Sequence, residues 1–172
     1  MGLRPGRTTR KLERPYTRVS KSKPRKSYVV GVPFPKIHQF EMGDRKGSYN
    51  LAIYGIAKDS VQIRHNALEA ARIVTTKYLE KVLGTNFFFK ILKFPHHVLR
   101  EKPIAQGAGA DRYSQGMGSH PFGKPTGVAV QIYKEERLMV IRVAKENLET
   151  AKQAMKKASL KLSTPLRIEV EG

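Results

Sequence analysis

The residues closest to a catalytic motif lie between Gly118 and Pro125, which read Gly-Ser-His-Pro-Phe-Gly-Lys-Pro. A phosphate-binding P-loop places a Ser or Thr directly after its Gly-Lys pair, and that hydroxyl binds magnesium. Here Pro125 follows Lys124 and cannot supply the hydroxyl, and the next residues are strand-like, so no helix N-terminus is offered to the phosphates. We therefore do not expect nucleotide hydrolysis. Glycine and lysine can still approach a phosphodiester backbone closely.

The histidines offer no other recognisable reaction. The chain has five histidines and no cysteine, which excludes thiolate zinc sites, disulfides and cysteine nucleophiles. The histidine spacing matches no zinc pattern, and no serine or carboxylate pair stands in a catalytic context. His96, His97 and His120 flank a glycine-rich stretch, where they could contact RNA or be ordinary surface histidines. The sequence thus predicts no enzyme, no metal, no cofactor and no small-molecule substrate.

The charge of the chain points to a polyanionic partner. Lys plus Arg number 33 against 14 Asp plus Glu, a formal net charge of +19. Each cation set against a phosphate releases a condensed counterion, so such an excess favours nucleic acid. No apolar run approaches the roughly 18 residues of a membrane span, and the N-terminus lacks the apolar core of a secretory signal. We expect a cytoplasmic protein with no membrane partner.

Residues 1–26 form the most basic segment, with Glu13 as the only acid. Its prolines interrupt any helix, and it has too few apolar residues to order itself, so we expect it to become ordered on its partner. It reads as an extended nucleic-acid-binding arm, although a solvated or targeting tail has the same composition. The ten cations of this arm are Arg4, Arg7, Arg10, Lys11, Arg14, Arg18, Lys21, Lys23, Arg25 and Lys26.

A long stretch between Lys102 and Gly127 has neither strand nor helix periodicity and contains six glycines. A structureless run of this length inside a compact domain is usually functional or mobile. We predict a protruding basic loop, held by strands on both sides. We expect its isolated acids, Glu101 and Asp111, to pair with the neighbouring Arg100 and Arg112.

The remaining sequence predicts an α+β fold, with two helices on one face of a mainly antiparallel sheet. We predict helices over 64–83 and 148–162. The predicted strands cover 48–58, 86–94, 96–100 and 166–170, and 127–133 with 137–144 should form a hairpin. Before the first strand we expect an extended connector over 28–40, which could include an edge strand, and a turn over 42–47. Residues 27–172 would then form a single domain that carries the arm and the loop.

Three features of these elements leave alternatives open. Asn66 and Glu69 could form a capping box for the first helix, although Asp59 or Ser60 could start it earlier. Arg64, His65 and Arg72 in its first half could be solvated or could bind phosphate. Phenylalanines 87–89 could be core residues of a strand or a platform on which bases stack.

The motifs taken together resemble a known family. Residues 66–72 (Asn-Ala-Leu-Glu-Ala-Ala-Arg) before a helix, 107–112 (Gly-Ala-Gly-Ala-Asp-Arg), 116–118 (Gly-Met-Gly) and 122–125 (Phe-Gly-Lys-Pro) resemble the universal large-subunit ribosomal protein L-sixteen family. The basic start, residues 4–10, fits the archaeal and eukaryotic branch, called L-ten-e. The chain ends soon after its last strand, without the longer extension of eukaryotic members, and this favours an archaeal source.

The resemblance implies an α+β sandwich with a hammerhead-like sheet, a structural role in the large ribosomal subunit, and binding to large-subunit rRNA between the central protuberance and the tRNA-facing cleft. It implies that the loop over about 102–117 points toward the peptidyl transferase centre and helps position tRNA. The loop residues that would face tRNA are Gly107, Gly109, Asp111, Arg112 and Gln115. Implied partners are rRNA, tRNA and neighbouring ribosomal proteins.

Beyond the arm, the cations and histidine predicted to contact RNA are Arg64, Arg72, His96, Arg100, Lys102 and Lys124. A free RNA chaperone or regulatory RNA-binding protein would need the same charge, so composition does not separate it from a ribosomal constituent.

Overall fold

A computed structural model describes residues 3–13, 29, 31–101 and 123–172. Its larger layer is a five-stranded sheet in the order β1-β4-β7-β2-β8, in which every neighbouring pair is antiparallel. The strands are β1 (Glu41–Gly43), β2 (Leu51–Ala57), β4 (Phe88–Ile91), β7 (Arg137–Val143) and β8 (Leu166–Glu171). This sheet supplies one wall of the core.

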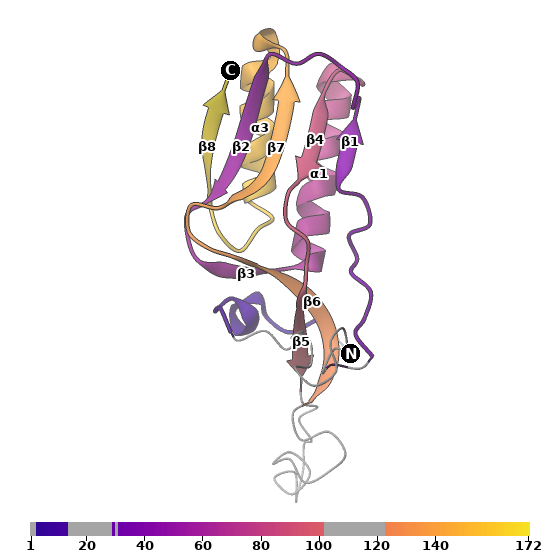
Figure 1. Ribbon diagram of the computed structural model, residues 1–172, viewed down its shortest axis with the longest axis vertical. Coiled ribbons are helices and arrows are strands. Elements are labelled where there is room, and N and C mark those ends of the chain that lie inside the picture. The colour runs from indigo at the N-terminus through magenta and orange to yellow at the C-terminus, as the bar shows by residue number, and fades with distance from the viewer. Residues whose placement is uncertain (1–2, 14–28, 30, 102–122) are drawn as a thin grey trace, which may run out of the picture.

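Two helices cover one face of that sheet and pack against each other (Figure 1). They are α1 (His65–Leu83) and α3 (Leu148–Ser159), and a short 3-10 helix η2 (Lys145–Asn147) precedes α3. Leu68 and Leu79 of α1 and Met155 of α3 are fully buried against strand residues such as Ile53 and Ile141. The expected α+β sandwich of two helices on a mainly antiparallel sheet is therefore confirmed.

A second, smaller sheet extends from the sandwich at the lower end of Figure 1. It has the order β3-β6-β5, all antiparallel, and was not foreseen as a separate layer. Its strands are β3 (Val61–Arg64), β5 (His97–Glu101) and β6 (Lys124–Ile132). The register pairs Glu101 with Lys124, so the chain leaves and re-enters this sheet on neighbouring strands.

Several predicted boundaries differ from the structure. Residues 41–43, expected to open a turn, form β1 instead, because they pair with Phe88–Lys90 of β4. The strand expected over 48–58 begins at Leu51. Residues 61–64 form β3 and are not the start of a helix. Helix α3 ends at Ser159 rather than 162, β4 is confined to residues 88–91, and β6 begins at Lys124 rather than Gly127. The hairpin expected from 127–133 and 137–144 is wrong, because β6 pairs with β3 and β5 in the small sheet and β7 pairs with β2 and β4 in the large one.

Two of the open alternatives are decided by the packing. Phe87, Phe88 and Phe89 are 1%, 7% and 0% exposed, so they are core residues and not a stacking platform. Arg64 is the N-cap of α1, and no side-chain hydrogen bond caps that end, so the Asn66–Glu69 capping box does not form. Within the described part of the chain, no helix is long and apolar enough to cross a bilayer.

Candidate nucleic-acid interface

The first described residues, 3–13, form a strap that lies along the small sheet. It contains one turn of 3-10 helix, η1 (Gly6–Thr9), and is drawn in indigo in Figure 1. The backbone N–H of Gln62 donates to the carbonyl of Arg10 (2.9 Å), and Gln62 Nε2 donates to the carbonyl of Lys11. Gln131 Nε2 donates to the carbonyl of Glu13 (2.5 Å). The expectation that the arm has no order of its own is therefore wrong for these residues, because two glutamines satisfy their backbone carbonyls.

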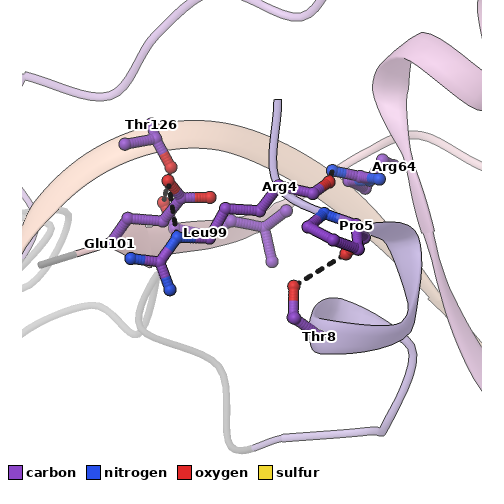
Figure 2. Close-up of polar contacts among 7 residues, drawn as sticks. All are labelled: Arg4, Pro5, Thr8, Arg64, Leu99, Glu101 and Thr126. Carbon is purple, nitrogen blue, oxygen red and sulfur yellow. Dashed lines mark hydrogen bonds and ion pairs between the residues drawn. The ribbon is translucent and has the colours of Figure 1, made fainter. Parts of the chain in front are cut away.

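Arg4 ties the beginning of the strap to both ends of the small sheet (Figure 2). Its carbonyl accepts a hydrogen bond from Arg64 Nη1 at 2.8 Å, and its Nε lies 3.5 Å from Glu101 Oε2. We expected Glu101 to pair with Arg100, but its ion pair is with Arg4 instead. The strap thus holds the last residue of β5, at the point where the chain leaves the sheet toward residues 102–122.

Three cations line a cleft between the strap, the start of α1 and the turn after α3. This basic cleft has a volume of about 210 Å³, and its lining includes Gly6, Arg10, Gln62, Arg64 and Lys161. It opens beside the N-terminus of α1, whose first turn carries no acidic residue and no side-chain cap. Cations beside the free N–H groups of a helix start suit an anion such as a phosphodiester. Lys161 was missed by sequence reasoning because it looked like one more solvated helix lysine.

Arg72 is held within the protein to a greater extent than the sequence suggested. Its Nε and Nη2 donate to the two carboxylate oxygens of Glu69 at 2.9 and 2.6 Å, and Nη1 lies 3.4 Å from Gln39 Oε1. The hydrogen bonds that Arg72 donates to the Glu69 carboxylate raise the pKa of Arg72 above its ordinary value. A phosphate at Arg72 would therefore have to compete with an intramolecular bidentate pair.

The histidines divide into exposed and buried groups. His96 is exposed, and its ring lies 4.8 Å from that of Phe94. His97 is only 3% exposed, so its expected place on the surface is wrong, and burial lowers its pKa. His65, which could have been solvated or could have bound phosphate, is buried instead; burial lowers its pKa, and nearby Lys36 and Arg64 lower it further. Its Nδ1 accepts a hydrogen bond from the backbone N–H of Lys36 at 3.2 Å.

The other predicted contacts are distributed as follows. Arg7, Arg10 and Lys11 on the strap and Lys124 at the start of β6 are exposed, and Arg100 of β5 is partly buried. Outside the described residues lie Arg14, Arg18, Lys21, Lys23, Arg25, Lys26, Lys102, Gly107, Gly109, Asp111, Arg112, Gln115 and His120. The structure thus gathers strap, β3 and β6 cations at the small sheet, at the end of the molecule where residues 102–122 depart.

The open face of the five-stranded sheet has a different character. Arg137 forms ion pairs with Glu169 (3.6 Å) and Glu171, and its guanidinium lies 3.9 Å from the centre of the Tyr54 ring. Lys90 is paired with Glu41 at 2.7 Å. Because Arg137 and Lys90 are paired with carboxylates, their positive charge is less available to a polyanion than that of the exposed cations at the strap end. Among the described residues, no cluster of three or more His, Cys, Asp or Glu side chains could hold a metal ion.

Comparison with known proteins gives one consistent result. A family model described as "Ribosomal protein L16p/L10e" matches residues 16–169. The protein named "Large ribosomal subunit protein uL16" of Archaeoglobus fulgidus is 43% identical over 172 residues, which cover 99% of this chain and 94% of that protein. The proteins of the same name from Sulfolobus acidocaldarius and Saccharolobus solfataricus are 47% and 49% identical, with coverage of 100% and 99% of this chain and 96% and 93% of theirs.

Proposed function

The chain belongs to the ribosomal protein L16p/L10e family, in its archaeal L10e branch, and from this premise we propose how it works as a structural, non-enzymatic constituent of the large ribosomal subunit. It binds large-subunit rRNA near the central protuberance and the tRNA-facing cleft, beside neighbouring ribosomal proteins. The observation that carries this proposal is the basic cleft at the strap end of a chain with a net charge of +19.

The strap end is the proposed docking surface. Arg10, Arg64 and Lys161 converge beside the uncapped N-terminus of α1, where a phosphate oxygen could accept hydrogen bonds from both side chains and backbone. Arg7, Lys11 and Lys124 are exposed nearby on the strap and β6 and would extend the contact along the RNA backbone. The open face of the large sheet supports the same orientation. Lys90 and Arg137 on that face already form ion pairs with carboxylates, which makes it the less favourable side for a polyanion.

We place the tRNA-positioning role in residues 102–117. Residues 102–117 follow the end of β5, which is paired with the start of β6, and the family resemblance directs them to the peptidyl transferase region. Arg112 is the cation nearest its centre, and Arg can bind phosphate oxygens with its fork or stack on a base. The loop would adjust tRNA or nearby rRNA without bond chemistry.

The variant Arg112→Ala tests this role. Because the strap and the folded body dock the protein, mutant subunits should keep full occupancy of the chain. They should bind tRNA less tightly, by about 1 to 3 kcal/mol if one charged set of hydrogen bonds is lost. Full occupancy together with wild-type tRNA binding and peptide-bond formation would contradict the role. Failure to incorporate would show that Arg112 is an assembly contact.

Crosslinking in cell lysate tests the broader proposal. The chain is crosslinked to RNA, purified under denaturing conditions, and the attached RNA is sequenced. We expect the crosslinks to concentrate in a few segments of large-subunit rRNA, with Arg10→Ala and Lys161→Ala each weakening the same segments. Crosslinks dispersed over many unrelated RNAs would instead support a free RNA chaperone.

A further inference from the structure

An exposed aromatic pocket lies between the connection from β4 to β5 and the end of β6; Figure 1 shows this connection running from the large sheet to the small one. Its lining includes Leu92, Lys93, Phe94, His96, Gln131 and Tyr133, and its volume is about 460 Å³, within the range of pockets that hold small planar molecules. Phe94 is 46% exposed and Tyr133 is 56% exposed. Phenylalanines 87–89 are at most 7% exposed, so Phe94 and Tyr133 stand apart from the aromatic residues of the core.

The rings of this aromatic pocket are held in place from behind. The Phe94 ring lies 5.5 Å from that of Phe40 and 4.8 Å from that of His96. The backbone N–H of Tyr133 donates to Glu136 Oε2 at 3.0 Å, and the same carboxylate pairs with Lys93 at 3.1 Å. These contacts order the Phe94 ring on one side of the pocket and the Tyr133 backbone on the other. The protein would therefore lose little conformational entropy when a planar ligand enters.

The surroundings of the pocket favour a polyanion that carries planar groups. Gln131 lines the pocket, and its Nε2 binds the carbonyl of Glu13 at the end of the strap. The chain continues from that carbonyl into Arg14 and the five further cations of residues 14–26. The described end of the strap thus lies beside a pocket of rings and precedes a basic stretch of sequence, and cations next to aromatic rings are the combination that single-stranded nucleic acid uses.

We propose that this aromatic pocket takes an unpaired nucleobase of the RNA, stacked against Phe94, His96 or Tyr133. The inference rests on the proposed function, since it presupposes an RNA partner, and it adds a base-stacking site that is separate from the basic cleft. Stacking on aromatic rings tolerates any base, so the pocket would secure an extruded nucleotide without reading its identity.

The test uses the full chain and a single-stranded RNA of about twelve nucleotides that carries one 2-aminopurine, whose fluorescence falls when it stacks. Wild-type protein and Tyr133→Phe, which keeps the ring, should quench the probe equally. Tyr133→Ala should quench it less and bind the RNA about five- to 150-fold more weakly. Leu160→Ala is the matched control, because Leu160 is 84% exposed and lies outside the pocket.

Two further measurements keep the outcome decisive. Phe94→Leu retains apolar volume where an alanine could unfold the protein, and it should also reduce quenching. An RNA of equal length with an abasic position in place of 2-aminopurine should bind more weakly to the wild type. Equal affinity for the two RNAs, or wild-type quenching by Tyr133→Ala, would overturn the pocket as a base site and point to a protein side chain as its occupant. Such a result leaves the proposed function intact, whereas absence of rRNA crosslinks in lysate would remove that function itself.

Discussion

Gly43, at the end of edge strand β1, has no room for a side chain. Its φ is 84°, and a Cβ at this position would lie 2.0 Å from the carbonyl oxygen of Phe87. That oxygen accepts the hydrogen bond from Asp44 N at 2.8 Å, so it cannot move away without breaking the contact. Both the backbone conformation and the space therefore require glycine here.

We expect Gly43→Ala to lower the free energy of unfolding by on the order of 3 kcal/mol, since left-handed strain and a backbone clash add together. Gly84→Ala is the matched control: its φ is 63°, but nothing lies within 4 Å of the added methyl group. It should cost about 1 kcal/mol. Urea unfolding of both variants measures the difference, and equal losses would show that the clash at Phe87 is relieved by a small shift.

The buried His65 and His97 make the stability of the protein depend on pH. Burial is the main cause that lowers both pKa values, so in the folded state each imidazole resists protonation. The unfolded chain takes up these protons near the ordinary value of about 6.5, and it therefore binds more protons than the native state as pH falls through that region. The stability present above this pH is lost on acidification.

The unfolding free energy should accordingly fall between about pH 7.5 and pH 5.5. His65→Asn should reduce that slope, since its amide oxygen can still accept from Lys36 N while the titrating group is gone. Leu160→Ala, which changes an exposed side chain with no titrating group, serves as the control and should leave the slope unchanged. Identical slopes for the wild type and His65→Asn would show that His65 is not the group that titrates.

At the scale of elements, the strap is the part that sequence reasoning described least well. Its basic composition correctly marked it as unable to form a core, but it becomes ordered through carbonyls that meet the side chains of Gln62 and Gln131. Such contacts depend on tertiary placement and leave no periodic signal in the strap itself. Gln62 is only 2% exposed, so its side chain needs a hydrogen-bond partner inside the protein, and the carbonyl of Lys11 provides it.

Two variants distinguish the residues that attach the strap to the small sheet from those that bind RNA. Gln62→Leu removes the donor to Lys11, so backbone amides of β3 and the neighbouring β6 should exchange hydrogen faster, while those of α1 and α3 keep their protection. Arg7→Ala, on the exposed side of the strap, should leave exchange unchanged and reduce the salt slope of rRNA binding by roughly 0.7 to 0.9. Hydrogen exchange and salt titration measure the two effects. Faster exchange across the helices after Gln62→Leu would mean that the two sheets unfold as one unit.

The elements with long, periodic patterns were predicted well, and the short ones were not. Both helices follow from apolar spacing and turn residues that need no knowledge of a partner strand. The strands β6 and β7 were also located from their apolar residues, but their pairing as a hairpin was wrong, because β6 pairs with β3 and β5 whereas β7 pairs with β2 and β4. Strand β3 has only four residues, and Val61, Gln62 and Ile63 are all buried, so it shows no alternation. Strand β1 has three residues and exists only through its pairing with β4.

On the scale of the whole molecule, charge and shape are arranged along one axis. The sandwich is stabilised by an apolar core, and on its open sheet face Lys90 and Arg137 form ion pairs with carboxylates. The small sheet and the strap gather exposed cations at the other end. The overall charge could be read directly from the sequence. Its concentration around the basic cleft could not, because Arg10, Arg64 and Lys161 are distant in the chain and meet only through the strap and the turn after α3.

Sedimentation of large ribosomal subunits tests the central claim most directly. Subunits from cells that express the tagged chain are washed in high salt, separated on a density gradient, and the chain is quantified against rRNA. We predict stable retention at about one copy per large subunit, and loss of that retention when Arg10, Arg64 and Lys161 are all replaced by glutamine in a chain that still unfolds cooperatively. Recovery of the wild-type chain among free proteins, with none in the large-subunit peak, would contradict the account.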